Sequence, residues 1–148
     1  MTAKTYLEQH HRLTAKTQRL RDAIEEARAA AEYPGINLSG MPHSPSHRNT
    51  QEDKLIRLAT LEEALLQTIL EDQETIYEIE NTINEINNEE AAEVLHLRYI
   101  KNLPFEARYG KETISAATHY SIPHVYTLHR KGLKEVQKIL DERQEPFA

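Results

Sequence analysis

Apolar side chains recur with heptad spacing between residues 55 and 86, where gaps of three and four residues alternate. Residues spaced in this way share one face of a helix and form the seam of a coiled coil. Eight of the ten seam positions are apolar over more than four heptads, so we predict one long helix over residues 51–87. The seam positions are Leu55, Leu58, Glu62, Leu65, Ile69, Asp72, Ile76, Ile79, Ile83 and Ile86.

Glu62 and Asp72 are the two polar positions in this seam. Polar seam residues sometimes set the register of the helices. Because no nearby residue type indicates a partner for a buried carboxylate, we expect both acids to sit at the edge of the seam.

The segment over residues 4–32 is also predicted to be helical, because it is rich in Ala, Glu, Arg, Gln and Leu. Residues 34–50 hold three prolines and two glycines, which predicts a non-helical linker. The two helices would fold back on each other through this linker as an antiparallel coiled-coil hairpin. The unmatched length of the second helix leaves room for another chain, so a homodimer through the coiled coil is expected. In the first helix, one position recurs every seven residues: Tyr6, Leu13, Leu20 and Ala27.

Three shorter helices are predicted in the rest of the chain. Asn88 can cap a helix that ends before Pro104. Residues 111–120 form a short helix, and a last helix runs from Ser121 to about Arg143. No stretch has a convincing strand pattern, so the expected fold class is all-α. We predict two domains, a coiled-coil hairpin over residues 1–87 and a small helix-turn-helix bundle over residues 88–148.

The stretch over residues 111–133 favours a helix-turn-helix. Ile114 fits the inner face of its first helix, and Ser115 is a small residue where the two helices approach closest. Tyr120 can fill the turn from inside. His119 stands where such turns usually have glycine, at a position that requires a positive φ.

The last helix has an apolar face and a basic face. Ser121 can cap it, and Pro123 suits its first turn. The apolar face is formed by Val125, Leu128, Gly132 and Val136. Basic side chains on the opposite face could contact DNA phosphates. Short polar side chains near the helix start could reach the edges of the nucleobases in the major groove. The alternative is an ordinary solvated basic face. The candidate DNA-binding residues are Ser121, His124, Thr127, Arg130, Lys131 and Lys134.

Charge is distributed unevenly along the chain. Net charge is −6, yet residues 1–95 carry 9 Lys and Arg against 18 Asp and Glu, whereas residues 96–148 carry 9 against 6. The basic C-terminal part is therefore the one expected to meet phosphate.

"LHLRYIKNLPF" and "TISAATHYSIPHVYTLHRKGLKEV", placed behind a long acidic helix, resemble the phage late-transcription regulators of the ArpU/RinA type. The DNA-binding end of that family is similar to region four of sigma-70 factors. The resemblance implies a recognition helix over residues 122–133, capped by Ser121. It also implies an activator of late phage or prophage genes that binds double-stranded DNA in the cytoplasm of a bacterial host. The coiled coil would dimerise or engage RNA polymerase. One departure is the segment over residues 103–110, which is longer here than in the family.

Other functions are less favoured by the sequence. A phage packaging protein of the terminase small-subunit type also joins a helix-turn-helix to a coiled coil, and a coiled-coil adaptor between proteins is a further alternative. Cysteine is absent, and His124 and His129 are five residues apart, which turns them away from each other on a helix. His43 and His47 lie in the linker. We therefore expect no metal, no cofactor and no enzymatic activity. No apolar run approaches the roughly 20 residues that span a bilayer, so no membrane association is expected.

Overall fold

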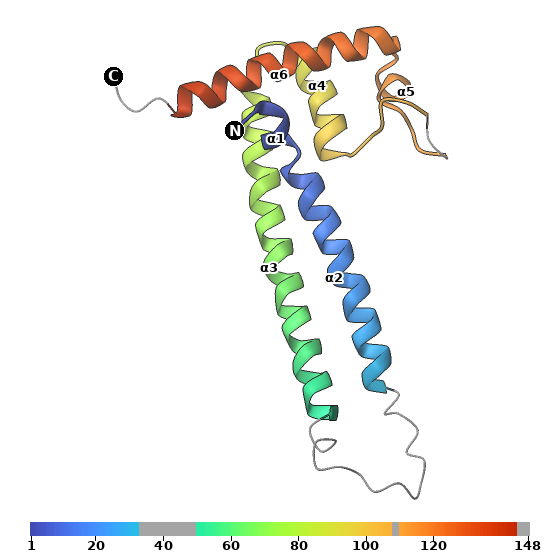
Figure 1. Ribbon diagram of the computed structural model, residues 1–148. Helices are drawn as coiled ribbons and strands as arrows, with labels where there is room; N and C mark the ends of the chain where they lie inside the picture. Colours follow the sequence, from blue (N-terminus) through green and yellow to red (C-terminus); the bar gives the residue numbers. More distant parts are fainter. Residues whose placement is uncertain (33–49, 108–109, 145–148) are drawn as a thin grey trace, which may run out of the picture. The chain divides into compact units, whose positions relative to one another are not determined.

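The structure, a computed structural model, describes residues 1–32, 50–107 and 110–144. Every regular element in these ranges is a helix, which confirms the all-α prediction (Figure 1). The predicted linker over residues 34–50 lies outside the described residues except for Thr50. The elements are α1 (Ala3–Leu7), α2 (Gln9–Glu32), α3 (Thr50–Asn84), α4 (Glu89–Leu95), the π-helical turn η2 (His96–Ile100), α5 (Ile114–Thr118) and α6 (Ile122–Gln144).

The chain forms two compact units. Unit 1 comprises Met1–Arg12 and Asp72–Ala148, and unit 2 comprises Leu13–Glu71. The sequence predicts other bounds, with a coiled-coil hairpin over residues 1–87 and a helix-turn-helix bundle over residues 88–148. That division into domains stays a prediction.

Unit 2 pairs the second part of α2 with the first part of α3. Arg28 Nη2 donates to Glu62 Oε1 at 3.0 Å, and Gln51 Nε2 donates to the carbonyl oxygen of Ala31 at 3.1 Å. These contacts join the end of one helix to the start of the next, so the two segments run in opposite directions. Glu62 is exposed, as expected for a residue at the edge of the seam. The supercoiling of a coiled coil stays a prediction.

Asp72, in unit 1, does not sit at the edge of the seam as we expected. Its Oδ1 lies 2.7 Å from His10 Nδ1, and the two side chains are only 15% and 11% exposed. The carboxylate is tolerated in the seam because the imidazole shields and hydrogen-bonds it. His10 falls outside the seven-residue repeat of the N-terminal helix, so that pattern does not reveal it.

The core of unit 1 contains two hydrophobic clusters. The first joins α1, the end of α3, α4 and α6, and its buried members are Ala3, Tyr6, Leu7, Ile79, Ile83, Ile86, Leu95, Tyr99, Val136 and Leu140. A polar network that runs from buried Thr82 to the surface lies at the same junction. Thr82 Oγ1 accepts from Arg143 Nη1 at 2.9 Å and lies 2.9 Å from the Tyr6 hydroxyl, while Arg143 Nη2 donates to Glu85 Oε2 at 3.2 Å. These bonds fasten the end of α6 to α3.

The second cluster lies between α4, α5 and α6. Its buried members are Ala91, Val94, Ile114, Val125 and Leu128. The connection that reaches α5 starts at Asn102, which ends the preceding helix in the left-handed region with a φ of 60°. The amide of Leu103 then donates to the carbonyl oxygen of Leu97 at 3.0 Å, and the carbonyl of Pro104 accepts from the amide of Ile114 at 3.1 Å. This connection therefore places α5 beside α6.

No helix in the described part of the chain has an apolar stretch that could cross a bilayer.

Candidate nucleic-acid interface

A tight turn joins α5 to α6 (Figure 1). Thr113 Oγ1 accepts from the amide of Ala116 at 3.1 Å and so caps α5. His119 ends α5 with a φ of 63°, as expected for the position that usually carries glycine. Ser115 Oγ donates to the carbonyl oxygen of Tyr120 at 2.6 Å, which closes the turn from the α5 side. The turn is thus held by side-chain hydrogen bonds in place of a glycine.

The inner face of α6 packs on α4 and α5 as the apolar pattern predicted. Val125, Leu128, Gly132 and Val136 are all buried. Gly132 marks a close approach of α6 to the Leu95 side chain of α4, because a Cβ at this position would lie 2.8 Å from Leu95 Cδ1. The opposite face of α6 is therefore turned outward by the packing of its inner face.

The six candidate DNA-binding residues lie on or beside this outward face. Ser121 Oγ accepts from the amide of His124 at 3.3 Å, which confirms the predicted cap. Thr127 is partly buried, and its Oγ1 donates to the carbonyl oxygen of Pro123 at 3.0 Å. The other five residues are exposed: Ser121, His124, Arg130, Lys131 and Lys134.

Among the described residues, the Lys and Arg side chains of this face form no ion pair within 4 Å. None of the five ion pairs among the described residues involves Arg130, Lys131 or Lys134. Lys138 is also exposed and outside these pairs. By contrast, Arg143 at the end of the same helix is paired with Glu85. We call Arg130, Lys131, Lys134 and Lys138 the basic face of α6.

An acidic residue borders this face at the start of α6. Glu90 Oε2, in the first turn of α4, lies 3.6 Å from His124 Nε2. The pKa of Tyr120 is raised by burial first and then by the charges of Glu90 and Glu93. The spacing pattern of α6 could not reveal this neighbour, because Glu90 belongs to another helix.

His129, on the inner side of α6, belongs to a cluster of aromatic rings. Its Nε2 lies 2.7 Å from the Tyr99 hydroxyl, and its ring stacks on that of Tyr99 with a centroid distance of 5.7 Å. Burial lowers the pKa of His129 to about 4 and raises that of Tyr99 to about 12. The imidazole is therefore neutral near pH 7, where its Nε2 can accept a hydrogen bond from the Tyr99 hydroxyl.

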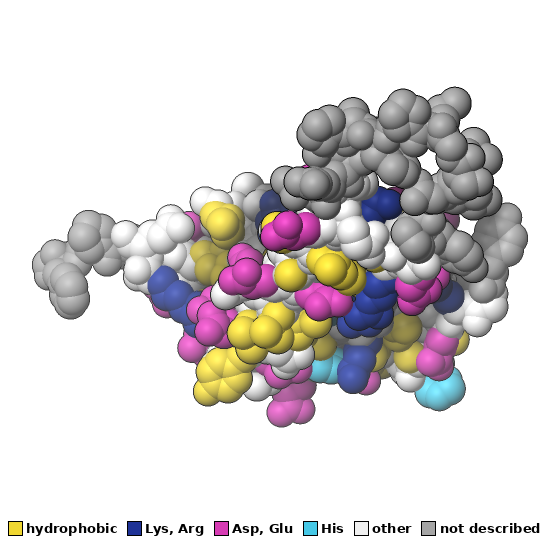
Figure 2. All heavy atoms as spheres, turned by 90° about the horizontal axis from the view of Figure 1, so that it is seen from below, with side chains coloured by type: hydrophobic (Ala, Val, Ile, Leu, Met, Phe, Trp, Pro, Cys, Tyr) yellow, Lys and Arg dark blue, Asp and Glu magenta, His cyan; other side chains and the backbone are white. Residues whose placement is uncertain are grey.

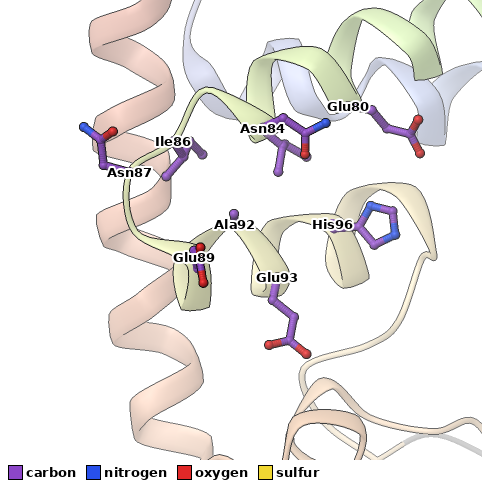
Figure 3. Close-up of a pocket in the computed structure, with 9 residues that line it drawn as sticks. Glu80, Asn84, Ile86, Asn87, Glu89, Ala92, Glu93 and His96 are labelled. Atoms are coloured by element: carbon purple, nitrogen blue, oxygen red, sulfur yellow. The ribbon is translucent and has the colours of Figure 1, made fainter.

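Two of the hollows on the described part of unit 1 bear on this interface. A groove of about 760 Å³ lies between the end of α3 and α4, and Figure 3 shows acidic and amide side chains around it. A smaller pocket of about 300 Å³ lies beside α6 and is lined by cationic and aromatic side chains. The acidic groove does not suit DNA, because carboxylates repel phosphate. Its lining includes Glu80, Asn84, Asn87, Glu89, Glu93 and His96.

No group of three or more potential metal ligands occurs among the described residues. His43 and His47 lie outside the described residues.

Residues 43–130 match the model of a family described as a protein of unknown function, DUF1492, and the chain belongs to that family. The matched region extends from before α3 to Arg130 in α6. No curated protein and no solved structure matches the chain.

Proposed function

We propose that the protein is a sequence-specific DNA-binding regulator of phage or prophage transcription, an activator of late genes, with α6 as its recognition helix. The observation that carries the proposal is the basic face of α6, which is exposed and outside the ion pairs among the described residues. Cations that have no carboxylate partner are available for phosphates.

The start of α6 supports a role in reading bases. Recognition helices place their N-terminal residues against base edges in the major groove. His124 and Thr127 lie in the first two turns, at one end of the basic face. Imidazole and hydroxyl groups can both form hydrogen bonds with base edges. The specificity for a DNA sequence would come from these two side chains. Most of the affinity would come from the basic side chains that follow them along α6.

The first experiment is recovery of sheared genomic DNA from the host or its phage by the purified protein at two salt concentrations, followed by sequencing. The proposal predicts enrichment of a discrete site that survives the higher salt. Uniform recovery that disappears with salt would show contact with phosphates alone. No recovery at either salt would contradict the proposal and favour an adaptor that binds other proteins.

Variants divide the two roles. Lys131→Ala and Lys134→Ala are expected to weaken binding to every sequence and to reduce the slope of log K against log salt by about 0.9 for each phosphate that is no longer neutralised. His124→Ala and Thr127→Ala are expected to change the preferred site, with a discrimination loss of about 1–3 kcal/mol each. Lys16→Ala, an exposed lysine of α2, is the control and should bind as the wild type does.

We further propose that a second copy of the chain covers an exposed apolar stripe on α3. Leu55, Leu66 and Leu70, all in unit 2, are 52%, 59% and 54% exposed. Eleven residues make close to three helical turns and four residues make close to one, so the three side chains share one face. In an antiparallel pair of α3 helices Leu66 would face its own copy. Figure 2 shows exposed apolar side chains next to acidic ones on one face of the molecule.

The proposed dimer has a distinctive dependence on salt. Glu63 borders the stripe and is exposed, so two copies bring like charges together. Dimerisation should therefore strengthen as salt rises, opposite to DNA binding. Sedimentation equilibrium should show a dimer that Leu66→Glu disrupts, while Thr60→Glu, with the same charge on a neighbouring face, leaves it intact. A ring of many subunits would contradict the dimer and favour a packaging protein. A monomer at every salt concentration would contradict the dimer and would favour RNA polymerase as the partner that covers the stripe.

A further inference from the structure

Cationic and aromatic side chains line the small pocket beside α6. Its volume is about 300 Å³. It is formed by η2, by the connection to α5 and by the second turn of α6. The lining residues are Arg98, Asn102, Pro104, Phe105, Glu106, Lys111 and Tyr126.

Among the described residues, the Arg98 side chain donates one hydrogen bond and stacks on an aromatic ring. Its guanidinium carbon lies 4.6 Å from the centre of the Phe105 ring, and its Nη1 donates to the carbonyl oxygen of Leu103 at 3.2 Å. A guanidinium has five N–H donors in a planar fork that matches phosphate oxygens. The stacking on Phe105 fixes this fork before any ligand arrives, which lowers the entropy lost on binding.

Lys111 supplies a second cation at the same pocket. Neither Arg98 nor Lys111 takes part in an ion pair among the described residues. Glu106 is the one acid of the lining, and its carboxylate opposes an anion.

The pocket is continuous with the DNA-facing side of α6. Tyr126 stacks on Phe105 with a centroid distance of 4.9 Å and an interplanar angle of 26°. Tyr126 precedes Arg130 by four residues, so the two side chains are neighbours on the surface of the helix. An anion in the pocket would therefore lie next to Arg130, the first residue of the basic face of α6.

We propose that this pocket binds a phosphate group of the DNA backbone through Arg98 and Lys111. The inference rests on the proposed function and adds a contact that α6 itself does not supply. It also gives a role to Phe105, which follows η2 and lies against the Arg98 guanidinium. A phosphate fixed here would set the position of the start of α6 on the duplex, since phosphate contacts determine register and orientation.

The test compares variants that move the pocket charge in opposite directions. Lys111→Ala should weaken DNA binding about five- to tenfold at 0.1 M salt and reduce the slope of log K against log salt by about 0.9. Glu106→Gln removes the opposing carboxylate and should tighten binding. Lys101→Ala is the matched control, because Lys101 is exposed on the neighbouring turn but does not line the pocket. Circular dichroism should show the same helix content in all of these variants.

The outcomes separate the pocket from the basic face of α6. If Lys131→Ala weakens DNA binding but Lys111→Ala and Glu106→Gln bind as the wild type does, the pocket proposal alone is wrong. If Lys101→Ala weakens binding as much as Lys111→Ala, any nearby lysine has the same effect and the pocket proposal is also wrong. Calorimetric titration with inorganic phosphate at constant ionic strength tests the other source of a phosphate group. Saturable binding that depends on Lys111, without any effect of Lys111→Ala on DNA affinity, would assign the pocket to a free phosphate compound. If the wild type lacks salt-dependent affinity for DNA, both proposals fail.

Discussion

Replacing Gly132 by alanine tests how closely α6 packs on α4. In the middle of an ordinary exposed helix, this change would stabilise the protein by about 0.5–1 kcal/mol, because alanine loses less backbone entropy on folding. At Gly132 the new Cβ would lie 2.8 Å from Leu95 Cδ1 and 2.9 Å from Leu95 Cγ. Both distances are well below van der Waals contact, so Leu95 or one of the two helices must shift.

The size of the effect depends on the freedom of the Leu95 side chain. Leu95 is 0% exposed and belongs to the first core cluster, so it cannot rotate into solvent. Overpacking of a close-packed core costs about 1–3 kcal/mol. After subtraction of the gain in helix propensity, Gly132→Ala should destabilise the protein by about 1–2 kcal/mol.

Urea denaturation followed by circular dichroism measures this difference, and a double-mutant cycle assigns it to the Gly132–Leu95 contact. Leu95→Ala alone should cost about 2–5 kcal/mol, because it leaves a cavity. In the Gly132→Ala background the same change should cost less, since the new methyl occupies part of that cavity. A stabilising Gly132→Ala, or additive costs in the cycle, would refute the close packing of the two helices.

Three further predictions concern titratable groups. The pKa of His129 is about 4 in the folded chain and 6.5 ordinarily, so the unfolded chain binds the proton more tightly. The free energy of unfolding should therefore fall as pH drops from about 6.5 towards 4. The full pKa shift corresponds to about 3 kcal/mol of unfolding free energy, which partial exposure reduces to about 1–2 kcal/mol. Urea titrations should show a smaller change in unfolding free energy between pH 7.5 and pH 4.5 for His129→Gln than for the wild type. Glu90→Gln removes the carboxylate beside His124 and should tighten DNA binding about threefold at low salt, an effect that fluorescence anisotropy should no longer show near 1 M salt. Asp72→Ala leaves His10 without its partner and should cost about 1–3 kcal/mol of unfolding free energy, and an equal loss in Asp72→Asn, which keeps a hydrogen-bond acceptor, would argue against the pair.

Features that depend on one stretch of sequence could be predicted well. The buried positions of α6 and its cap at Ser121 follow from helical spacing and from the hydrogen bond that a serine hydroxyl can offer. The positive φ of His119 follows from the geometry of a tight turn between two helices. In each case the residues that determine the structure are neighbours along the chain.

Features that join distant segments could not be predicted in this way. Periodicity shows which face of a helix is apolar, but it does not identify the residue that a given side chain meets. The His10–Asp72 pair connects positions 62 apart, and the Tyr99–His129 pair connects positions 30 apart. The cationic pocket is a similar case, because Arg98 and Tyr126 meet only through Phe105 in the connection between η2 and α5.

Net charge alone is a poor guide to the proposed interface, for a reason that follows from screening. At physiological ionic strength, exposed charges interact over about 8 Å, so an acid affects bound phosphate only when it lies close to it. The net charge of −6 therefore matters less than which acids border α6. Glu90, within 3.6 Å of His124, is close enough to oppose phosphate at the start of the helix. The acids of α3 that lack such proximity should change the affinity only at low salt. Glu90→Gln should thus change DNA affinity at about 0.15 M salt more than Glu78→Gln, which neutralises an exposed α3 acid of the same compact unit, although both change the net charge equally.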